Sequence, residues 1–205
     1  MAGVEEPPVV HRGVRSGKLD ENGTPLGDHR CTPPEIWSVA LEALGAKTFD
    51  LDAATNDFAT IPAIVRCTGP KVGGADGLAV PWWGNVWLNF PFSTPNPWIA
   101  KVGSEADRML QPVLRMNESL PPSELPPRSI TVLGPGDSAV AWWRAMRQTC
   151  DAWAMWPKRA HFPRPDQPKG SAPGPVHLWY IGPRATRWRT IMESHGVPTS
   201  TGALP

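Results

Sequence analysis

Short apolar segments alternate along this chain with segments of helical periodicity, and this alternation most limits the folds it can adopt. Strands are expected at residues 48–52, 85–89, 130–133, 152–156 and 176–181, with helices between several of them. Strands that alternate with helices predict an α/β fold, with a mostly parallel sheet covered by helices on both faces. Ligands of such folds bind at the carboxyl ends of the strands, so the residues that follow each strand are candidates for a site.

Local signals predict the helices. Residues 32–35 read Thr-Pro-Pro-Glu, the pattern of a capping box with proline at the first helical position. Apolar residues then recur at helical spacing as far as Leu44, and Gly45 is placed to end this helix in a left-handed conformation. Further helices are expected over 98–109 and 138–149.

The chain length of 205 residues is enough for one domain with its own core and too short for two ordinary domains. Residues 1–28 mix proline, glycine and charged side chains without periodicity, which predicts a flexible N-terminal arm. A single domain is expected over 29–195, followed by a C-terminal tail over 196–205. Proline-rich stretches at 112–128 and 157–175 are expected to be loops or insertions.

The formal net charge of +1 hides an uneven distribution, because residues 128–205 carry 10 basic and 4 acidic side chains. This basic half can be interpreted as a surface that faces nucleic-acid phosphates or as an ordinary solvated surface. Cys31, Cys67 and Cys150 form no C-x-x-C pair, which indicates neither a zinc site nor a disulfide framework and fits a reducing compartment. Since no apolar stretch reaches about 18 residues, we expect a cytoplasmic protein without a membrane partner. The five histidines show no metal-ligand spacing, so no bound metal is expected.

Residues 86–93 carry the chemistry, because there an apolar strand delivers an amide, a stiff turn and an aromatic ring to a strand end. The exocyclic amine of a nucleobase is a poor nucleophile, since its lone pair is delocalised into the ring. Two acceptors that hold the amine hydrogens would localise this lone pair, and an aromatic ring would hold a flipped base by stacking. Asn89 can supply one acceptor and the Phe90 carbonyl the other. Pro91 stiffens the turn, and Phe92 offers the stacking face.

These residues resemble the catalytic loop of the phage-encoded DNA N-6-adenine methyltransferases. That loop usually reads Asn-Pro-Pro-Tyr-Ser, and residues 89–93 read Asn-Phe-Pro-Phe-Ser, so Phe90 replaces the first proline. The resemblance covers roughly residues 32–182 and implies a Rossmann-like S-adenosylmethionine-dependent methyltransferase fold. It also implies an enzyme that methylates N6 of adenine in double-stranded DNA as a monomer or weak dimer, with evasion of host restriction as its biological role.

Three other segments resemble cofactor-binding segments of the family and occur in the same order. Residues 32–37 look like the Thr-Pro-Pro segment that lies against the methionine part of the cofactor in related enzymes. Residues 49–54 look like the Asp-Leu-Asp-Pro-Ala-Ala strand end, and residues 76–78 like the Asp-Gly-Leu segment whose acid is expected near the cofactor adenine. The S-adenosylmethionine-binding residues that the resemblance implies are Thr32, Pro33, Asp50, Asp52, Asp76 and Leu78.

Two later segments also resemble the family. Residues 133–137, with the tryptophans at 142 and 143, look like its Leu-Pro-Ala segment and tryptophan-bearing helix. Residues 157–162 look like its Gly-Arg-x-x-Phe segment and lie in the basic, proline-rich loop, which we expect to face DNA phosphates. The expected DNA-binding residues are Ser93, Lys158, Arg159, Arg164 and Lys169.

Other interpretations of these residues stay open. Thr32 can be an ordinary helix cap, Asp50 and Asp52 can simply end a strand, and Asp76 can belong to a turn. Methylation of N4 of cytosine uses the same amine chemistry and is not distinguished by these motifs. A DNA-binding descendant in which Phe90 has ended turnover and a phage structural or assembly protein are the remaining alternatives.

Overall fold

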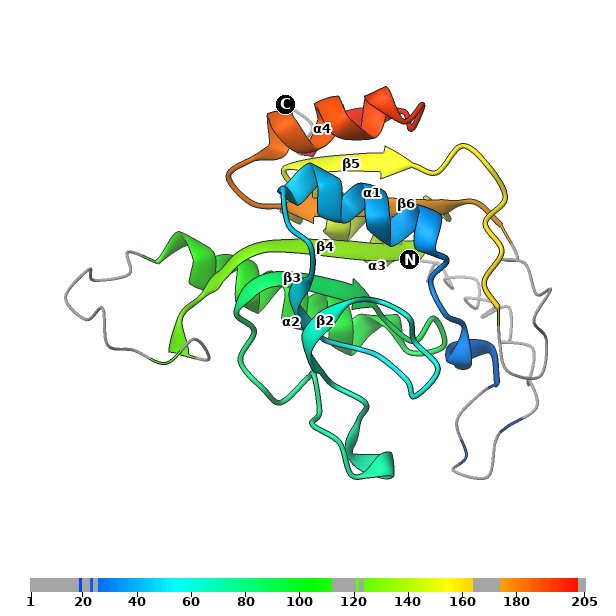
Figure 1. Ribbon diagram of the computed structural model, residues 1–205, viewed down its shortest axis with the longest axis vertical. Helices are drawn as coiled ribbons and strands as arrows, with labels where there is room; N and C mark the ends of the chain where they lie inside the picture. Colours follow the sequence, from blue (N-terminus) through cyan, green and yellow to red (C-terminus); the bar gives the residue numbers. More distant parts are fainter. Residues whose placement is uncertain are drawn as a thin grey trace, which may run out of the picture.

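The computed structural model describes residues 26–111, 124–163 and 174–202, together with the single residues 19, 23 and 121. Within these residues the chain forms one sheet with helices on both sides (Figure 1). In chain order the elements are η1 (Leu26–His29), α1 (Pro34–Leu44), β1 (Phe49–Asp52), β2 (Ala63–Arg66), η2 (Pro70–Val72), β3 (Gly84–Asn89), α2 (Pro95–Leu110), β4 (Pro127–Pro135), α3 (Ala141–Thr149), β5 (Ala152–Met155), β6 (Val176–Ile181), α4 (Ala185–Ser194) and β7 (Thr199–Thr201).

The described part of the chain contains a seven-stranded sheet in the order β2-β1-β3-β4-β6-β5-β7. Neighbouring strands from β2 to β4 are parallel, whereas β4–β6, β6–β5 and β5–β7 are antiparallel pairs. The predicted α/β class is therefore confirmed, and the architecture is consistent with a Rossmann-like fold. The sheet is mixed, however, and its parallel part is the half that contains β1 and β3.

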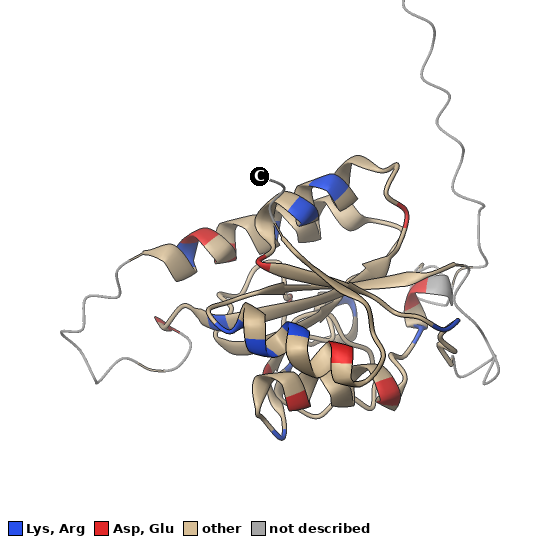
Figure 2. Ribbon diagram, turned by 90° about the horizontal axis from the view of Figure 1, so that it is seen from above, with Lys and Arg blue, Asp and Glu red and all other residues tan. Residues whose placement is uncertain are grey.

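The two faces of the sheet are covered by different helices, as Figure 2 shows in a view along the layers. One core cluster lies under α1 and α4, and the other lies under α2 and α3. Strand β3 supplies both, because Val86 and Leu88 point into the α2/α3 cluster and Trp87 points into the α1/α4 cluster. This alternation sets which face each residue at the end of β3 can reach.

Helix α1 confirms the sequence prediction at its end and corrects it at its start. Gly45 caps the carboxyl end with φ of 67°, a left-handed conformation that glycine adopts without steric cost. The amino-terminal cap residue is Pro33, and no side chain caps the helix. The predicted capping box at Thr32 is therefore wrong, because Thr32 lies one residue before the cap and its hydroxyl makes no hydrogen bond to the helix.

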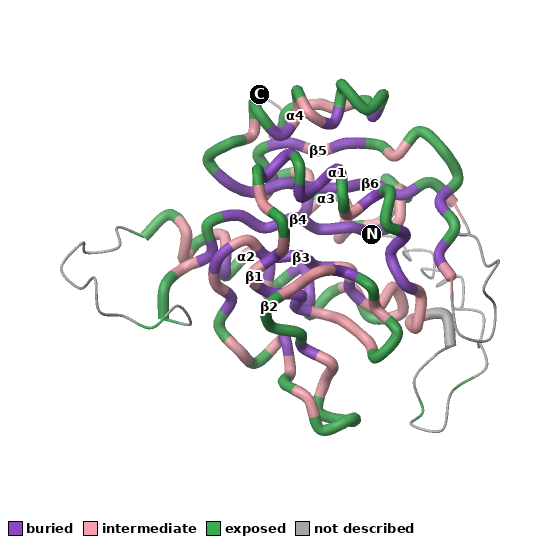
Figure 3. The backbone as a smooth tube through the Cα atoms, in the orientation of Figure 1, coloured by how far each residue is buried: buried purple, intermediate pink, exposed green. Residues whose placement is uncertain are grey.

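The ordered fold extends further at both ends than the sequence predicts. The 3-10 helix η1 lies inside the predicted N-terminal arm, and β7, inside the predicted C-terminal tail, pairs with β5. Strand β4 begins at Pro127, within the expected loop 112–128. Strand β2 and helix α4 were not predicted, and β2 lies at the edge of the sheet with Ile64 63% exposed (Figure 3).

Glu105 in α2 fastens this helix to the loop before β3. The side chain is 1% exposed, pairs with Lys101 at 2.7 Å and with Arg108, and accepts the backbone N–H of Trp82 at 3.3 Å. The indole N–H of Trp82 in turn donates to the carbonyl of Gly77 at 2.8 Å. A Cβ atom on Gly77 would lie 1.8 Å from the carbonyl oxygen of Ala53, so only glycine fits where this loop crosses the end of β1.

We predict that Glu105→Ala lowers the free energy of unfolding by roughly 2–4 kcal/mol, because it removes a buried carboxylate that satisfies two cations and a backbone N–H. Denaturant unfolding of the purified variant measures this change. Asp107→Ala, at an exposed position of the same helix, is the matched control and should alter stability by less than about 0.5 kcal/mol. Equal losses in both variants would contradict the anchoring role of Glu105.

Candidate functional site

The strand order reverses between β1 and β3. After β1 the chain forms β2 on one side of it and then returns to form β3 on the other side. In α/β sheets, ligands bind outside the carboxyl ends of the strands at such a reversal. The last residues of these two strands are Asp52 and Asn89. Asp52 pairs with Trp87, two residues before Asn89, so both side chains point to the same face of the sheet.

A cavity of about 130 Å³ lies at this point and is called the carboxyl-edge cavity below. Its walls come from the segment before α1, from the ends of β1, β2 and β3, and from the first turn of α2. In Figure 1 the segment before α1 passes the edge of the sheet to which the arrow of β5 points. The lining residues are Asp28, Arg30, Cys31, Thr32, Asp52, Ala54, Thr55, Asn56, Ala59, Ile61, Cys67, Thr68, Gly69, Asn89, Pro91 and Trp98.

A hydrogen bond joins the amide of Asn89 to Thr32. Its Nδ2 donates to the Oγ1 of Thr32 at 3.1 Å, and Thr32 is 2% exposed. Its Oδ1 is buried and has no hydrogen-bond partner among the described residues. Buried polar atoms are normally paired, so an unpaired acceptor at a cavity points to a donor that a ligand supplies.

Asp52 is the second unpaired group of the carboxyl-edge cavity. It is 0% exposed, and within the described chain neither carboxylate oxygen forms a hydrogen bond of normal geometry. Burial raises the pKa of Asp52 to about 6, against smaller lowering effects of Thr55, Ala54 and Arg66. A buried carboxylate without a cationic partner is complementary to a positively charged ligand group.

The aromatic residues after Asn89 both lie against the α2/α3 core, and both line a small hollow beside Asn89. Phe90 is 1% exposed and packs edge-on against Trp142 and Phe92, with ring centroids 5.5 and 5.6 Å apart. Its bulk therefore fills the α2/α3 core and leaves the cavity open. Phe92 is half-buried and lines a small hollow with Asn89 and Phe162. Of the predicted catalytic residues, Asn89 and Pro91 thus line the carboxyl-edge cavity, and Phe92 lines the small hollow that Asn89 also borders.

Asp50 does not belong to this site. Its Oδ2 accepts the backbone N–H of Asn85 at 2.6 Å and pairs with Arg128 at 2.7 Å. These contacts lie at the amino ends of β3 and β4, the opposite edge of the sheet from Asp52. The prediction that Asp50 contacts a cofactor together with Asp52 is therefore wrong, and the acid has a structural role.

The other predicted cofactor residues lie around the cavity without lining it. Asp76 closes a turn by accepting the backbone N–H of Leu78 at 2.9 Å, and Leu78 packs against the α2/α3 core. Pro33 is the amino-terminal cap residue of α1 and also lies outside the lining. Of the predicted cofactor set, Thr32 and Asp52 are the residues in the walls of the cavity.

The predicted DNA-binding residues do not share one environment. The hydroxyl of Ser93 donates to the Oδ2 of Asp28 at 2.6 Å, so it is engaged within the chain. Lys158 and Arg159 are exposed, on a segment tied to the cavity wall by the Cys31 N–H, which donates to the Pro163 carbonyl at 3.0 Å. Arg164 and Lys169 lie outside the described residues.

The basic half of the chain does not form one surface. Arg144 and Arg147 are in α3, whereas Arg187 and Arg189 are in α4. These two helices cover opposite faces of the sheet (Figure 2). The helical arginines therefore cannot all contribute to one phosphate-facing surface.

Asp28 and Arg30 were missed by sequence reasoning. Both line the carboxyl-edge cavity, and Asp28 accepts two hydrogen bonds from Ser93, one from its hydroxyl and one from its backbone N–H. They fall at the end of a stretch whose composition is typical of a flexible arm. Their closeness in sequence to Thr32 is the one signal that could have marked them.

Two thiols also line the cavity. Burial raises the pKa of both Cys31 and Cys67, and it raises that of Cys67 to about 11, with Asp52 and Asp76 adding to the effect. Both are therefore neutral thiols at pH 7 and poor nucleophiles. Among the described residues, no group of three or more His, Cys, Asp and Glu is arranged to hold a metal ion. The described helices include none with the length and apolar character needed to cross a bilayer.

Comparison of the chain with models of known families, with curated proteins and with solved structures finds no match. The function is therefore inferred from the chemistry of the site. Its two distinguishing features are the unpaired oxygens of Asp52 and Asn89 at one cavity.

We predict that Asp52→Asn removes a pH dependence of stability. Because the folded pKa is raised from 3.8 to about 6, the folded state holds more protons than the unfolded state between these values, and stability falls as pH rises through that window. The loss should level off above pH 6 at about 3 kcal/mol. The Asp52→Asn variant lacks this loss of stability and should therefore be more stable than wild type at pH 8.

Denaturant unfolding of both proteins from pH 4 to pH 8 measures this difference. His177, whose pKa burial lowers to about 4, makes stability rise with pH between about 4 and 6.5 in both proteins and cancels in the comparison. Parallel stability profiles for wild type and Asp52→Asn would show that Asp52 does not carry the raised pKa.

Proposed function

We propose that this protein is an S-adenosylmethionine-dependent DNA methyltransferase that transfers a methyl group to N6 of adenine. The observation that carries the proposal is the amide of Asn89, whose nitrogen donates to Thr32 and whose buried oxygen has no partner in the part of the chain that the structure describes. An acceptor fixed in this way suits the amine of a base, which has two hydrogens to donate. The resemblance of residues 89–93 to the catalytic loop of the phage adenine methyltransferases supports the same chemistry.

The residues of the carboxyl-edge cavity fit part of the cofactor. S-adenosylmethionine carries a positive sulfonium and an ammonium group, and the unpaired carboxylate of Asp52 is complementary to either. Thr32 leads into α1, and the positive end of the helix dipole there suits the cofactor carboxylate. The cavity of about 130 Å³ is smaller than the roughly 300–1,000 Å³ of sites for whole ligands of this kind, so the cofactor would extend beyond it. When bound, the cofactor supplies an electrophilic methyl group.

The chain itself would activate the amine. Asn89 Oδ1 accepts one amine hydrogen and the Phe90 carbonyl accepts the other, which turns the nitrogen lone pair towards the methyl donor. As the new C–N bond formed and the C–S bond to the methyl carbon broke, leaving a neutral thioether, positive charge would develop on the nitrogen, and the same two oxygens would stabilise it. The amine then loses one proton to solvent. Phe92 would stack on the base, and removal of water strengthens each of these contacts.

The position of Phe90 favours an active enzyme over an impaired descendant. Its ring lies in the α2/α3 core, on the other face of the sheet from Asn89, and does not block the cavity. The proline that follows keeps residue 90 extended, which allows its carbonyl to serve as the second acceptor. DNA would approach over the segment with Lys158 and Arg159, whose charges suit phosphates.

We predict that the protein transfers label from S-adenosyl[methyl-³H]methionine to unmethylated double-stranded DNA and that Asn89→Ala lowers the rate at least 100-fold. Asn96→Ala, at an exposed amide in the first turn of α2, is the control and should keep full activity. Nucleoside analysis of the product should give N6-methyladenine.

Three results would contradict this assignment. Label transfer that Asn89→Ala leaves unchanged would refute the site, and N4-methylcytosine as the product would refute the base. Binding of cofactor and DNA by wild type without any label transfer would show that the protein is a non-catalytic descendant.

We predict a positioning role for Thr32. Thr32→Val removes the acceptor that holds Asn89 Nδ2 and should lower the rate of methyl transfer roughly 10- to 100-fold, because misplaced acceptors lose alignment. Thr32→Ser keeps a hydroxyl and should retain most of the activity. Single-turnover rates at saturating cofactor and DNA test this, since they report the chemical step. Similar rates for the valine and serine variants would contradict the role.

A further inference from the structure

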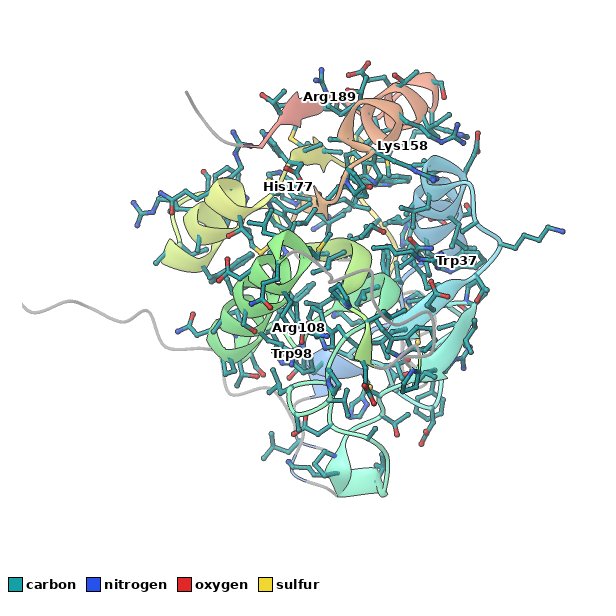
Figure 4. The ribbon with its side chains drawn as sticks, turned by 90° about the vertical axis from the view of Figure 1, so that its left-hand side faces the viewer. Trp37, Trp98, Arg108, Lys158, His177 and Arg189 are labelled. Atoms are coloured by element: carbon teal, nitrogen blue, oxygen red, sulfur yellow. The ribbon has the colours of Figure 1, made fainter. Side chains whose placement is uncertain are left out.

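A second and larger concavity lies at the opposite edge of the sheet. It has a volume of about 900 Å³ and is formed by the amino ends of β1, β3 and β4, the carboxyl end of β6, and the last turns of α1 and α2. We call it the amino-edge groove. In Figure 1 the arrow of β5 points to the right, so this edge lies on the left, and Figure 4 looks onto it. None of its lining residues takes part in the proposed methyl transfer.

The carboxylates of the amino-edge groove accept hydrogen bonds from other residues of the chain. Asp50 accepts hydrogen bonds from the Asn85 backbone at 2.6 Å and from Arg128 at 2.7 Å. Asp151 accepts the backbone N–H of Gly182 at 2.7 Å. The Oδ1 of Asn85 accepts the hydroxyl of Ser129 at 3.0 Å. These side-chain acceptors therefore already have donors.

The cationic side chains of the groove have more N–H donors than the groove has acceptors for them. Lys47 is exposed and forms no ion pair with any residue that the structure describes. Arg184 is exposed, and its Nη1 makes one long contact of 3.5 Å to the carbonyl of Leu44. Arg128 meets Asp50 through one nitrogen, with its side chain 68% exposed. A guanidinium has five N–H donors, so both arginines keep donors for a ligand.

One side of the groove is apolar. Met109 and Leu110, at the end of α2, line it together with Leu44 and Ile181. Leu110 is 83% exposed, which is unusual for a leucine beside other apolar groups and leaves its surface free for a ligand. The groove therefore combines an apolar wall with cationic donors.

We propose that the amino-edge groove is a second binding site, for an amphipathic organic anion with a carboxylate or phosphate head and an apolar body. The head meets Lys47, Arg128 and Arg184, and the body lies on Met109 and Leu110. The volume of about 900 Å³ is within the range of roughly 300–1,000 Å³ typical of small-molecule sites. This site does not depend on the proposed methyltransferase activity.

Calorimetric titration of the full chain with decanoate, decyl phosphate, 1-decanol and inorganic phosphate tests the proposal. Decanoate and decyl phosphate should bind saturably with one ligand per chain. Decanol, which lacks the charge, and inorganic phosphate, which lacks the apolar body, should each bind at least tenfold more weakly. Equal affinities for decanoate and decanol, or no saturable binding of either anion, would overturn it.

Variants place the ligand in the groove. Lys47→Gln and Arg184→Gln should each weaken decanoate binding about tenfold, the effect of losing one charge-assisted hydrogen bond. Arg144→Gln removes an exposed charge on α3, outside the groove, and should leave affinity unchanged. Ala106→Trp should fill the groove and abolish binding, with circular dichroism to check folding. Unchanged affinity in both charge variants would overturn the proposal even if the tryptophan variant did not fold.

Discussion

The hydrogen bond from Asn89 to Thr32 is the contact on which the carboxyl edge depends. It joins the end of a central strand to the residue that leads into α1, 57 positions earlier in the chain. The Thr32 hydroxyl accepts from the amide nitrogen and makes no cap bond to α1, and the amide oxygen at the cavity has no partner among the described residues. One contact thus joins the segment that leads into a helix to an amide whose oxygen is an unpaired acceptor.

Sequence reasoning predicted the buried elements and missed the edges. Strands β3 and β6 are continuous apolar runs, which tertiary contacts reinforce, and β6 has the predicted limits 176–181. Strand β2 is a four-residue edge strand with exposed Ile64 and Val65, and β7 consists of Thr199, Ser200 and Thr201. Both strands are held by backbone pairing with a neighbouring strand. Such pairing does not require a regular alternation of apolar and polar residues, so a short edge strand shows little periodicity in its sequence. Strands β5 and β6 were predicted, but their antiparallel pairing was not, because the residues of a strand do not specify the direction of its neighbour.

The residues of the candidate site that the sequence marked are those at the ends of strands. Asp52 and Asn89 end neighbouring parallel strands, so their type and position in the sequence were sufficient to mark them. Asp50 was misassigned because alternation along β1 does not say which edge of the sheet a half-buried acid serves. Asp28 and Arg30 were missed because they lie in an irregular segment with no periodicity, and only the folded chain brings this segment to the cavity. Long-range contacts of irregular segments are the part that local patterns do not encode.

The two edges of the sheet have opposite hydrogen-bond balances. At the amino edge the acids are satisfied within the chain and cations remain, whereas at the carboxyl edge Asp52 and the oxygen of Asn89 remain unpaired. Burial of Asp52 lowers the stability of the protein at neutral pH, and a cation bound beside it would favour the ionised form and restore that free energy. Binding would then release a proton below about pH 6 and none well above it. The Asp52 carboxylate, which destabilises the protein when no ligand is bound, is therefore the group that would favour binding of a cationic ligand.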